Sequence, residues 1–151
     1  MSLKLSTGLR NYMLDTGSVS AGLTSGVGGI ITIYAGVEPS SADDDVTGFT
    51  ALLTFTESGD GSTPLTFATP STGGSLLKLA SETWSGTVAN TGTASFYRHY
   101  ISNDAGGLST TALRVQGSIG VGGADLNMTT VSLVQSNNEV MDYYSINLPA
   151  V

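Results

Sequence analysis

The stretch that most constrains the fold is residues 81–101, SETWSGTVANTGTASFYRHYI, which holds the only Trp and the only His of the chain. Its Ser, Thr, aromatic and β-branched residues fit the pleated surface of a sheet better than a helix. Two extended segments, residues 82–88 and 93–101, flank an Ala-Asn-Thr-Gly sequence that suits a tight turn. The pattern predicts a β-hairpin at the centre of an all-β domain.

The second segment of this hairpin predicts a sheet that is covered on both sides. Because side chains alternate along a strand, Phe96, Arg98 and Tyr100 would lie on one face, and Tyr97 and His99 on the other. Both faces would then carry aromatic rings that need protection from water.

The rest of the chain reads as short strands separated by turn residues at fairly even spacing. The clearest is residues 29–36, rich in Ile and bounded by Gly. In the last one, Val140, Tyr144, Ile146 and Leu148 would face one side. The pattern is typical of a sandwich, jelly roll or barrel. The other predicted strands are residues 48–55, 65–68, 76–79, 113–119, 125–134 and 140–148.

Residues 3–23 are the one helical candidate. Ser6 or Thr7 could cap the helix, and the Ser/Gly-rich residues 17–29 would end it. Its apolar stripe consists of Leu5, Leu9, Tyr12 and Met13. The helix could cover its own sandwich, or it could be an arm that docks on a neighbour. We therefore expect an N-terminal helix or arm with linker at residues 1–28 and a β-sandwich domain at residues 29–151.

The charges of the chain argue against several kinds of partner. The net charge is −7, and the five basic residues are scattered singly, whereas nucleic-acid and anionic membrane surfaces select basic patches. No apolar run follows Lys4 and Arg10 as in a signal peptide, so a soluble protein that begins in a cytoplasm is expected. Charged residues are only 11% of the chain, which suits either a protein packed against neighbours or an ordinary β-sandwich.

Motifs for catalysis or cofactor binding are not found in the sequence. There is no Cys, no phosphate-binding glycine loop and no nucleophile elbow, and His99 lies inside a predicted strand. We expect no enzyme and no cofactor. A structural or partner-contacting role is expected for His99, and a core position for Trp84 is favoured over a sugar-stacking role.

The acidic residues Asp43, Asp44 and Asp45 resemble the first half of a calcium loop, with Gly48 at the glycine position. The twelfth position is Thr54, where the loop needs a bidentate Glu, and a strand is predicted where a helix should follow. A solvent-exposed acidic loop is the simpler interpretation.

Four pieces of sequence, taken in order, carry a family resemblance. They are LKLSTGLRNYMLDTGS, GGIITIYAGVEPSSADDDVTGFTALLTF, WSGTVANTGTASFYRHYISNDAG and VQGSIGVGGADLNM, and together they cover most of the chain. The series resembles small virion structural proteins of tailed bacteriophages, of the head decoration or capsid cement type. The resemblance implies a jelly-roll-like β-sandwich present in many copies on the outer surface of a capsid, with no catalytic or metal residue.

The expected function is to bridge neighbouring major capsid protein subunits, as a symmetric homodimer or homotrimer. An acidic chain is not expected to contact packaged DNA, which favours the outer surface. The alternatives are a neck or tail ring component of the virion and a carbohydrate-binding module with Trp84 or the tyrosines as platforms. The expected partner-binding residues are Leu3, Leu5, Leu9, Arg10, Tyr12, Met13, Asp43, Asp44 and Asp45.

Overall fold

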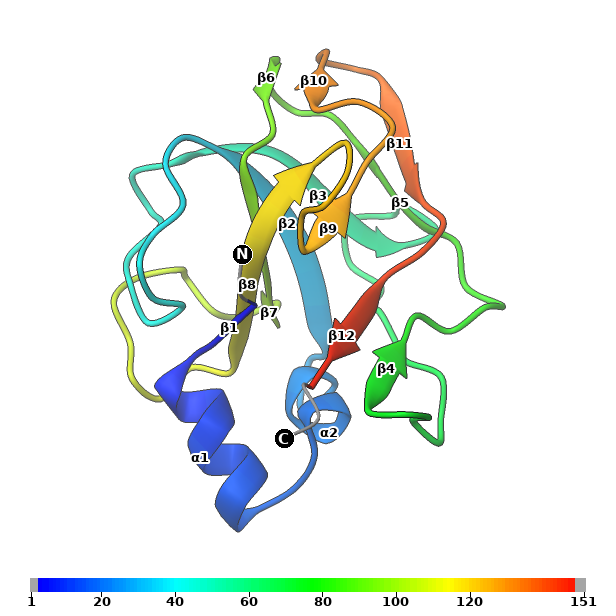
Figure 1. The fold of residues 1–151 in the computed structure, drawn as a ribbon. Helices are drawn as coiled ribbons and strands as arrows, with labels where there is room; N and C mark the ends of the chain where they lie inside the picture. Colours follow the sequence, from blue (N-terminus) through cyan, green and yellow to red (C-terminus); the bar gives the residue numbers. More distant parts are fainter. Residues whose placement is uncertain (1–2, 149–151) are drawn as a thin grey trace.

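The computed structural model describes residues 3–148 and is mostly β, with 37% strand and 10% helix. Its helices are short and lie at the N-terminal end of the chain (Figure 1). The elements in chain order are β1 (Lys4–Leu5), α1 (Thr7–Asp15), α2 (Val19–Leu23), β2 (Gly29–Ala35), β3 (Thr50–Glu57), β4 (Ser75–Leu77), β5 (Trp84–Thr87), β6 (Gly92–Thr93), β7 (Phe96–Ile101), β8 (Arg114–Gly120), β9 (Leu126–Asn127), β10 (Ser132–Leu133), β11 (Asn138–Met141) and β12 (Ser145–Asn147).

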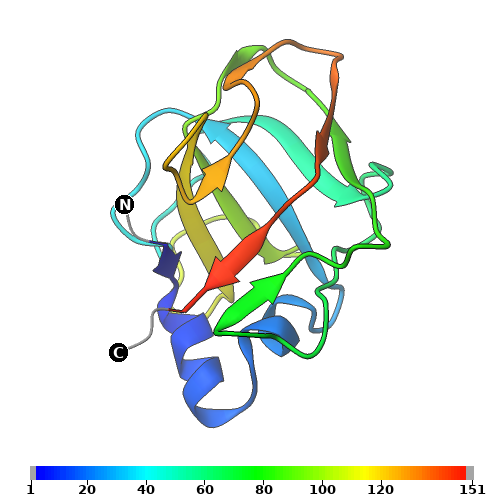
Figure 2. The same cartoon turned by 45° about the vertical axis from the view of Figure 1, so that its right-hand side comes forward.

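One large sheet organises the molecule. Its strand order is β1-β8-β7-β2-β3-β5-β11, each neighbouring pair is antiparallel, and β9 adds to β8 in parallel. The remaining strands form two small two-stranded sheets, β10–β6 and β12–β4 (Figure 2). The expected all-β, sandwich-like single domain is confirmed, with most strands in one sheet and only short pairs outside it.

The middle strands are covered on both faces, as the aromatic pattern of β7 predicted. Tyr97 belongs to the main hydrophobic core, together with Ile31 and Ile33 of β2. Phe96 points the other way, into a small cluster where its ring stacks on Tyr34 at 5.1 Å. The polar side chains of Arg98 and His99 are therefore buried as well, because this part of β7 is covered on both faces.

The predicted hairpin of residues 82–101 is wrong. β5 pairs with β3 and β11, whereas β7 lies between β2 and β8. The connecting residues bond to other parts of the chain: the amides of Ala89 and Asn90 donate to the carbonyl of Leu52, and that of Val88 donates to Asn137. These bonds hold the connection away from a tight turn, so the two strands separate within the sheet.

The single helix predicted for residues 3–23 is divided into β1, α1 and α2. Ser6 caps α1 as predicted, and its hydroxyl accepts from the amide of Leu9 at 3.1 Å. A second cap, Ser18, starts α2 after α1 has ended at Asp15. Leu9 and Leu23 are fully buried in the same core as the strands. The helices thus cover their own sandwich.

Three predicted strands near the chain's loops are shorter or broken. Residues 125–134 form only β9 and β10, and residues 65–68 make only isolated bridges. Residues 140–148 divide into β11 and β12 between Met141 and Ser145, so the expected common face fails: Val140 is 51% exposed, whereas Tyr144 and Ile146 are buried. An alternation of side chains holds only while the strand continues.

Candidate functional site

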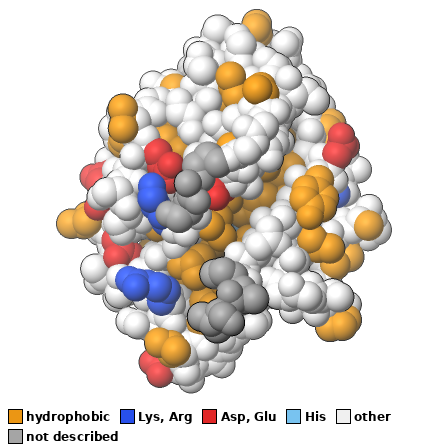
Figure 3. All heavy atoms as spheres, in the orientation of Figure 1, with side chains coloured by type: hydrophobic (Ala, Val, Ile, Leu, Met, Phe, Trp, Pro, Cys, Tyr) orange, Lys and Arg blue, Asp and Glu red, His pale blue; other side chains and the backbone are white. Residues whose placement is uncertain are grey.

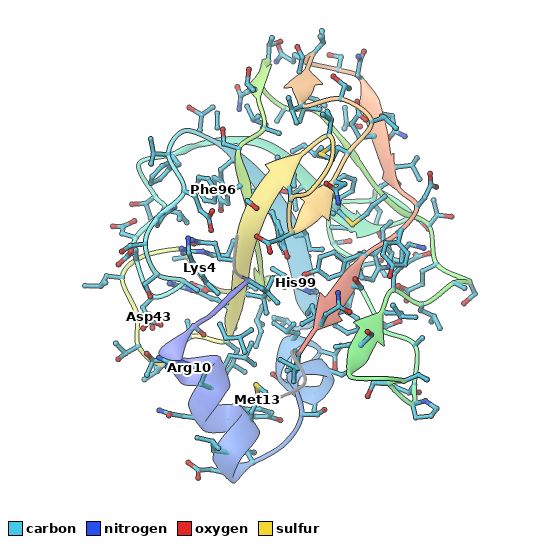
Figure 4. The ribbon with its side chains drawn as sticks, viewed as in Figure 1. Lys4, Arg10, Met13, Asp43, Phe96 and His99 are labelled. Atoms are coloured by element: carbon cyan, nitrogen blue, oxygen red, sulfur yellow. The ribbon has the colours of Figure 1, made fainter. Side chains whose placement is uncertain are left out.

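The two predicted partner-binding regions lie side by side. Asp43 sits at the start of α1, where its carboxylate accepts from the amide of Thr7 at 2.8 Å and from the Thr7 hydroxyl at 2.6 Å (Figure 4). Arg10 donates to the same hydroxyl at 3.0 Å. A carboxylate at this end of a helix is favoured by the free N–H groups and the helix dipole.

The apolar side chains of the N-terminal segment face the chain's own core. Leu9 is 0% exposed and offers no surface to a partner, while Leu3, Leu5 and Met13 are partly buried against the core. Tyr12 is half-buried, and Arg10 is exposed. Among the residues of this segment that were expected to bind a partner, Arg10 is the exposed one, and Tyr12 and Met13 are partly accessible.

The acidic residues 43–45 are not a freely solvated loop. Asp44 accepts from the amide of Ser41 at 2.9 Å, and Asp45 accepts from the hydroxyl and amide of Thr47, which lowers the pKa of Asp45. Only Asp45 of the three is fully exposed. Within residues 3–148, no three Asp, Glu, His or Cys side chains come together as they would to hold a metal ion.

Two arginines are buried beneath this loop. Arg114 is 1% exposed and grips the carboxylate of Asp104 through Nε at 2.5 Å and Nη2 at 2.7 Å. Burial of Asp104 acts to raise its pKa, but the bonds from Arg114 and the amide of Gly106 outweigh it and lower the pKa. Arg114 also donates to the carbonyl of Gly107 at 2.7 Å, so it links β8 to the loop that precedes it.

Arg98 is the second buried arginine, also 1% exposed. It donates to the carbonyl of Asp44 at 2.9 Å and to Oε1 of Gln116 at 2.6 Å, and its Nε has no partner. Burial, followed by the charge of Arg114, lowers the pKa of Arg98. From the sequence, both arginines were described only as singly scattered basic residues. The signal that pointed to Arg98 was its place between Phe96 and Tyr100 on one face of a strand expected to be covered on both sides.

His99 and Trp84 belong to an aromatic cluster in the core. Trp84 is 0% exposed and donates to Glu82 at 2.6 Å, so the core position favoured for it is confirmed and its role as a sugar platform is ruled out by burial. His99 packs against Phe67 at 5.4 Å and Tyr144 at 5.7 Å. Burial lowers the pKa of His99 to about 3, so the imidazole is neutral and structural at neutral pH.

A large groove on the surface lies between the helices and the β4–β12 pair. It measures about 630 Å³, and of the described residues that line it none is charged. We call it the helix groove; its apolar members are Met13, Val19, Ala21, Pro70, Leu76, Ile146 and Leu148. Met13 reaches it from α1, on the side that faces α2 (Figure 4).

The second groove lies between β9 and the β11–β12 segment. It measures about 520 Å³, and we call it the tyrosine groove because Tyr143, 68% exposed, lies on its rim. Asp142, Glu139, Asn127 and Asn147 give it polar and acidic walls. On the face of the molecule shown in Figure 3, hydrophobic side chains gather in a depression near the middle.

None of the helices in the described part of the chain is long and apolar enough to cross a membrane. Comparison of the chain with models of known families, with curated proteins and with solved structures finds no match.

Proposed function

We propose that this chain is a structural virion protein of a tailed phage that decorates the capsid and bridges neighbouring major capsid protein subunits. The resemblance of four sequence pieces to small decoration proteins supports the class. The proposed place is the outer surface of the shell, and the proposed form is a homodimer or homotrimer, because symmetric contacts on a shell favour symmetric partners. Many weak copies would stabilise the assembled shell by linkage and by multivalency.

The observation that carries the proposal is the helix groove. An open, uncharged groove of about 630 Å³ with seven apolar members suits burial against a protein surface rather than contact with water. It lies beside the N-terminal segment, where a partner surface was expected from the sequence. The proposed contact therefore leaves out Leu9, which the core uses, and keeps Met13 together with the groove beside it.

Two variants in α1 test the proposed contact. Met13→Asp places a charge in the groove, while Leu14→Asp places the same charge on the next residue, which is 83% exposed and outside the groove. Burying a methionine contributes about 1.5–3 kcal/mol, so Met13→Asp is expected to lower shell occupancy roughly tenfold or more. Leu14→Asp is expected to bind normally. The readout is the amount of protein that cosediments with purified shells, and thermal melts confirm that both variants fold.

The copy number of the chain in purified particles tests the function itself. Quantitative mass spectrometry that finds it at a ratio comparable to the major shell protein would support decoration. A few copies per particle would move the proposal to a neck or tail ring. Absence from the particle would rule out a virion role.

A carbohydrate-binding module is the second candidate, and the tyrosine groove is the observation that favours it. An exposed tyrosine beside amide and carboxylate side chains is a common arrangement for stacking and hydrogen bonding to a sugar. A glycan that binds here is expected to lose affinity when Tyr143 is replaced by Ala. A broad glycan panel that gives no binding to the folded chain would remove this candidate.

A further inference from the structure

A small cavity lies over the buried side chain of Arg98. It measures about 190 Å³ and is separate from both grooves. Arg98 and Tyr34, which is 7% exposed, lie at its floor, and the exposed residues Thr47, Ala51 and Ala105 lie at its mouth. The other lining residues include Tyr100, Phe49 and Asp104. The cavity is thus open to solvent at one end and has a cation at the other.

The hydrogen bonding of Arg98 is incomplete. Its Nη1 and Nη2 donate to a carbonyl and to an amide oxygen, both uncharged, and its Nε is buried with no partner. Within the described residues no carboxylate lies at ion-pair distance from this guanidinium. A buried charge without a countercharge is costly, and a buried donor without an acceptor adds to that cost. An anion in the cavity would supply the missing countercharge.

The surrounding charges limit the anion to a single negative charge. The carboxylate of Asp104 faces the same cavity, but it is held by Arg114. Those of Asp44 and Asp45 lie nearby and are bonded to serine and threonine donors. None of these carboxylates pairs with the guanidinium of Arg98, and together they would repel a doubly charged phosphate.

We propose that this cavity binds one carboxylate group, carried either by a small organic acid or by an Asp or Glu side chain of a partner protein. The guanidinium of Arg98 supplies the attracting positive charge, which acts most strongly in a site shielded from water. Tyr34 and Tyr100 also line the cavity, where the hydroxyl of Tyr100 is bonded to that of Thr32 at 2.9 Å, and Phe49 forms an apolar wall. The volume of about 190 Å³ accommodates a carboxylate with a short carbon chain.

The test is a titration of the isotopically labelled chain by NMR, with the Nε–H of Arg98 as the reporter. Propionate is expected to shift this signal saturably, with a dissociation constant of about 1–10 mM, the range of a weak single-group ligand. Propionamide, which has nearly the same shape and no charge, is expected to leave it unchanged. Absence of a shift with propionate at about 50 mM, or an equal shift with propionamide, would overturn the proposal.

Two variants and a peptide pair complete the test. Arg98→Gln is expected to abolish the propionate shifts of the neighbouring amides, and Tyr34→Phe, which keeps the ring packed on Phe96, is expected to weaken binding roughly threefold to tenfold. If Arg98→Gln does not fold, the wild-type titration and the Tyr34→Phe variant still decide whether the cavity binds a carboxylate. A blocked Gly-Glu-Gly peptide that binds more tightly than propionate, with the Gly-Gln-Gly peptide inert, would identify a protein side chain as the source; propionate binding alone would identify a small acid.

Discussion

The hydroxyl of Ser6 forms hydrogen bonds with two parts of the chain that are distant in sequence. It accepts from the amide of Leu9 and from the amide of Arg114, and it donates to the carbonyl of Ala112. Ser6→Ala is expected to lower the free energy of unfolding by about 1–3 kcal/mol, because it removes a helix cap and leaves buried groups unpaired. Ser18→Ala removes the exposed cap of α2 and is expected to cost less. Equal losses in urea unfolding would contradict the buried role of Ser6.

His99 should make the stability of the protein depend on pH. Its pKa falls from 6.5 to about 3 on folding because the ring is buried. Between these values the unfolded chain binds a proton that the folded chain does not, so the free energy of unfolding should decrease as the pH falls from 6.5. The slope for one such group approaches about 1.4 kcal/mol per pH unit.

Urea unfolding at several pH values between about 6.5 and 5, above the usual carboxyl range, isolates this effect. His99→Phe keeps an aromatic ring among Phe67, Trp84 and Tyr144 and is expected to flatten the slope. A variant that retains the wild-type slope would assign the pH dependence to other groups.

At the scale of elements, α1 is expected to behave as part of the core. Leu9→Ala should lower the free energy of unfolding by about 2–5 kcal/mol, since it opens a cavity at a residue with no exposed surface. Leu14→Ala, at the exposed end of the same helix, should change it by less than about 0.5 kcal/mol. If Leu9→Ala instead left the melting curve unchanged, the helix would be an arm and not a core element.

The elements that the sequence predicted well are those whose ends are marked by nearby residues, such as bordering glycines or a capping serine. β2 lies within one residue of its predicted bounds, because Gly29 and Gly36 border an Ile-rich run, and the hydroxyl of Ser6 was recognisable as a cap. The hairpin of residues 82–101 failed, because strand partners are chosen by long-range pairing. Its Ala-Asn-Thr-Gly sequence suggested a tight turn that bonds within itself, yet the side chain of Asn90 donates to the carbonyl of Ala51 on β3.

The candidate sites were harder to predict than the strands. Whether an arginine is buried depends on the loops that cover it. For Arg98 and Arg114 these are residues 36–49, far away in sequence, and residues 102–113, which connect the two strands that carry the arginines. The acidic residues 43–45 were recognised as a feature, but their partners Thr7, Ser41 and Thr47 were not. Side-chain pairing of this kind leaves no periodic pattern in a single sequence.

For the whole molecule, the net charge of −7 and the uncharged helix groove lead to different salt responses. If the groove carries the proposed shell contact, binding should change little between about 50 mM and 500 mM NaCl, because apolar burial is not screened. Docking through the acidic loop would weaken several-fold over that range. Cosedimentation with shells across the salt series distinguishes the two.

The pairing of β1 with β8 also has a consequence for how the protein is made. Ser6 and Arg114 are 108 residues apart, yet each bonds to the other's backbone. During translation, the segment of β1 and α1 leaves the ribosome long before β8, its pairing strand, has been synthesised. Until then the apolar side chains around Leu9 lack the core residues that cover them. Closing so long a loop is slow. The segment of β1 and α1 is therefore synthesised well before it can be fixed in place, and until β8 follows it is exposed to aggregation and to chaperone capture.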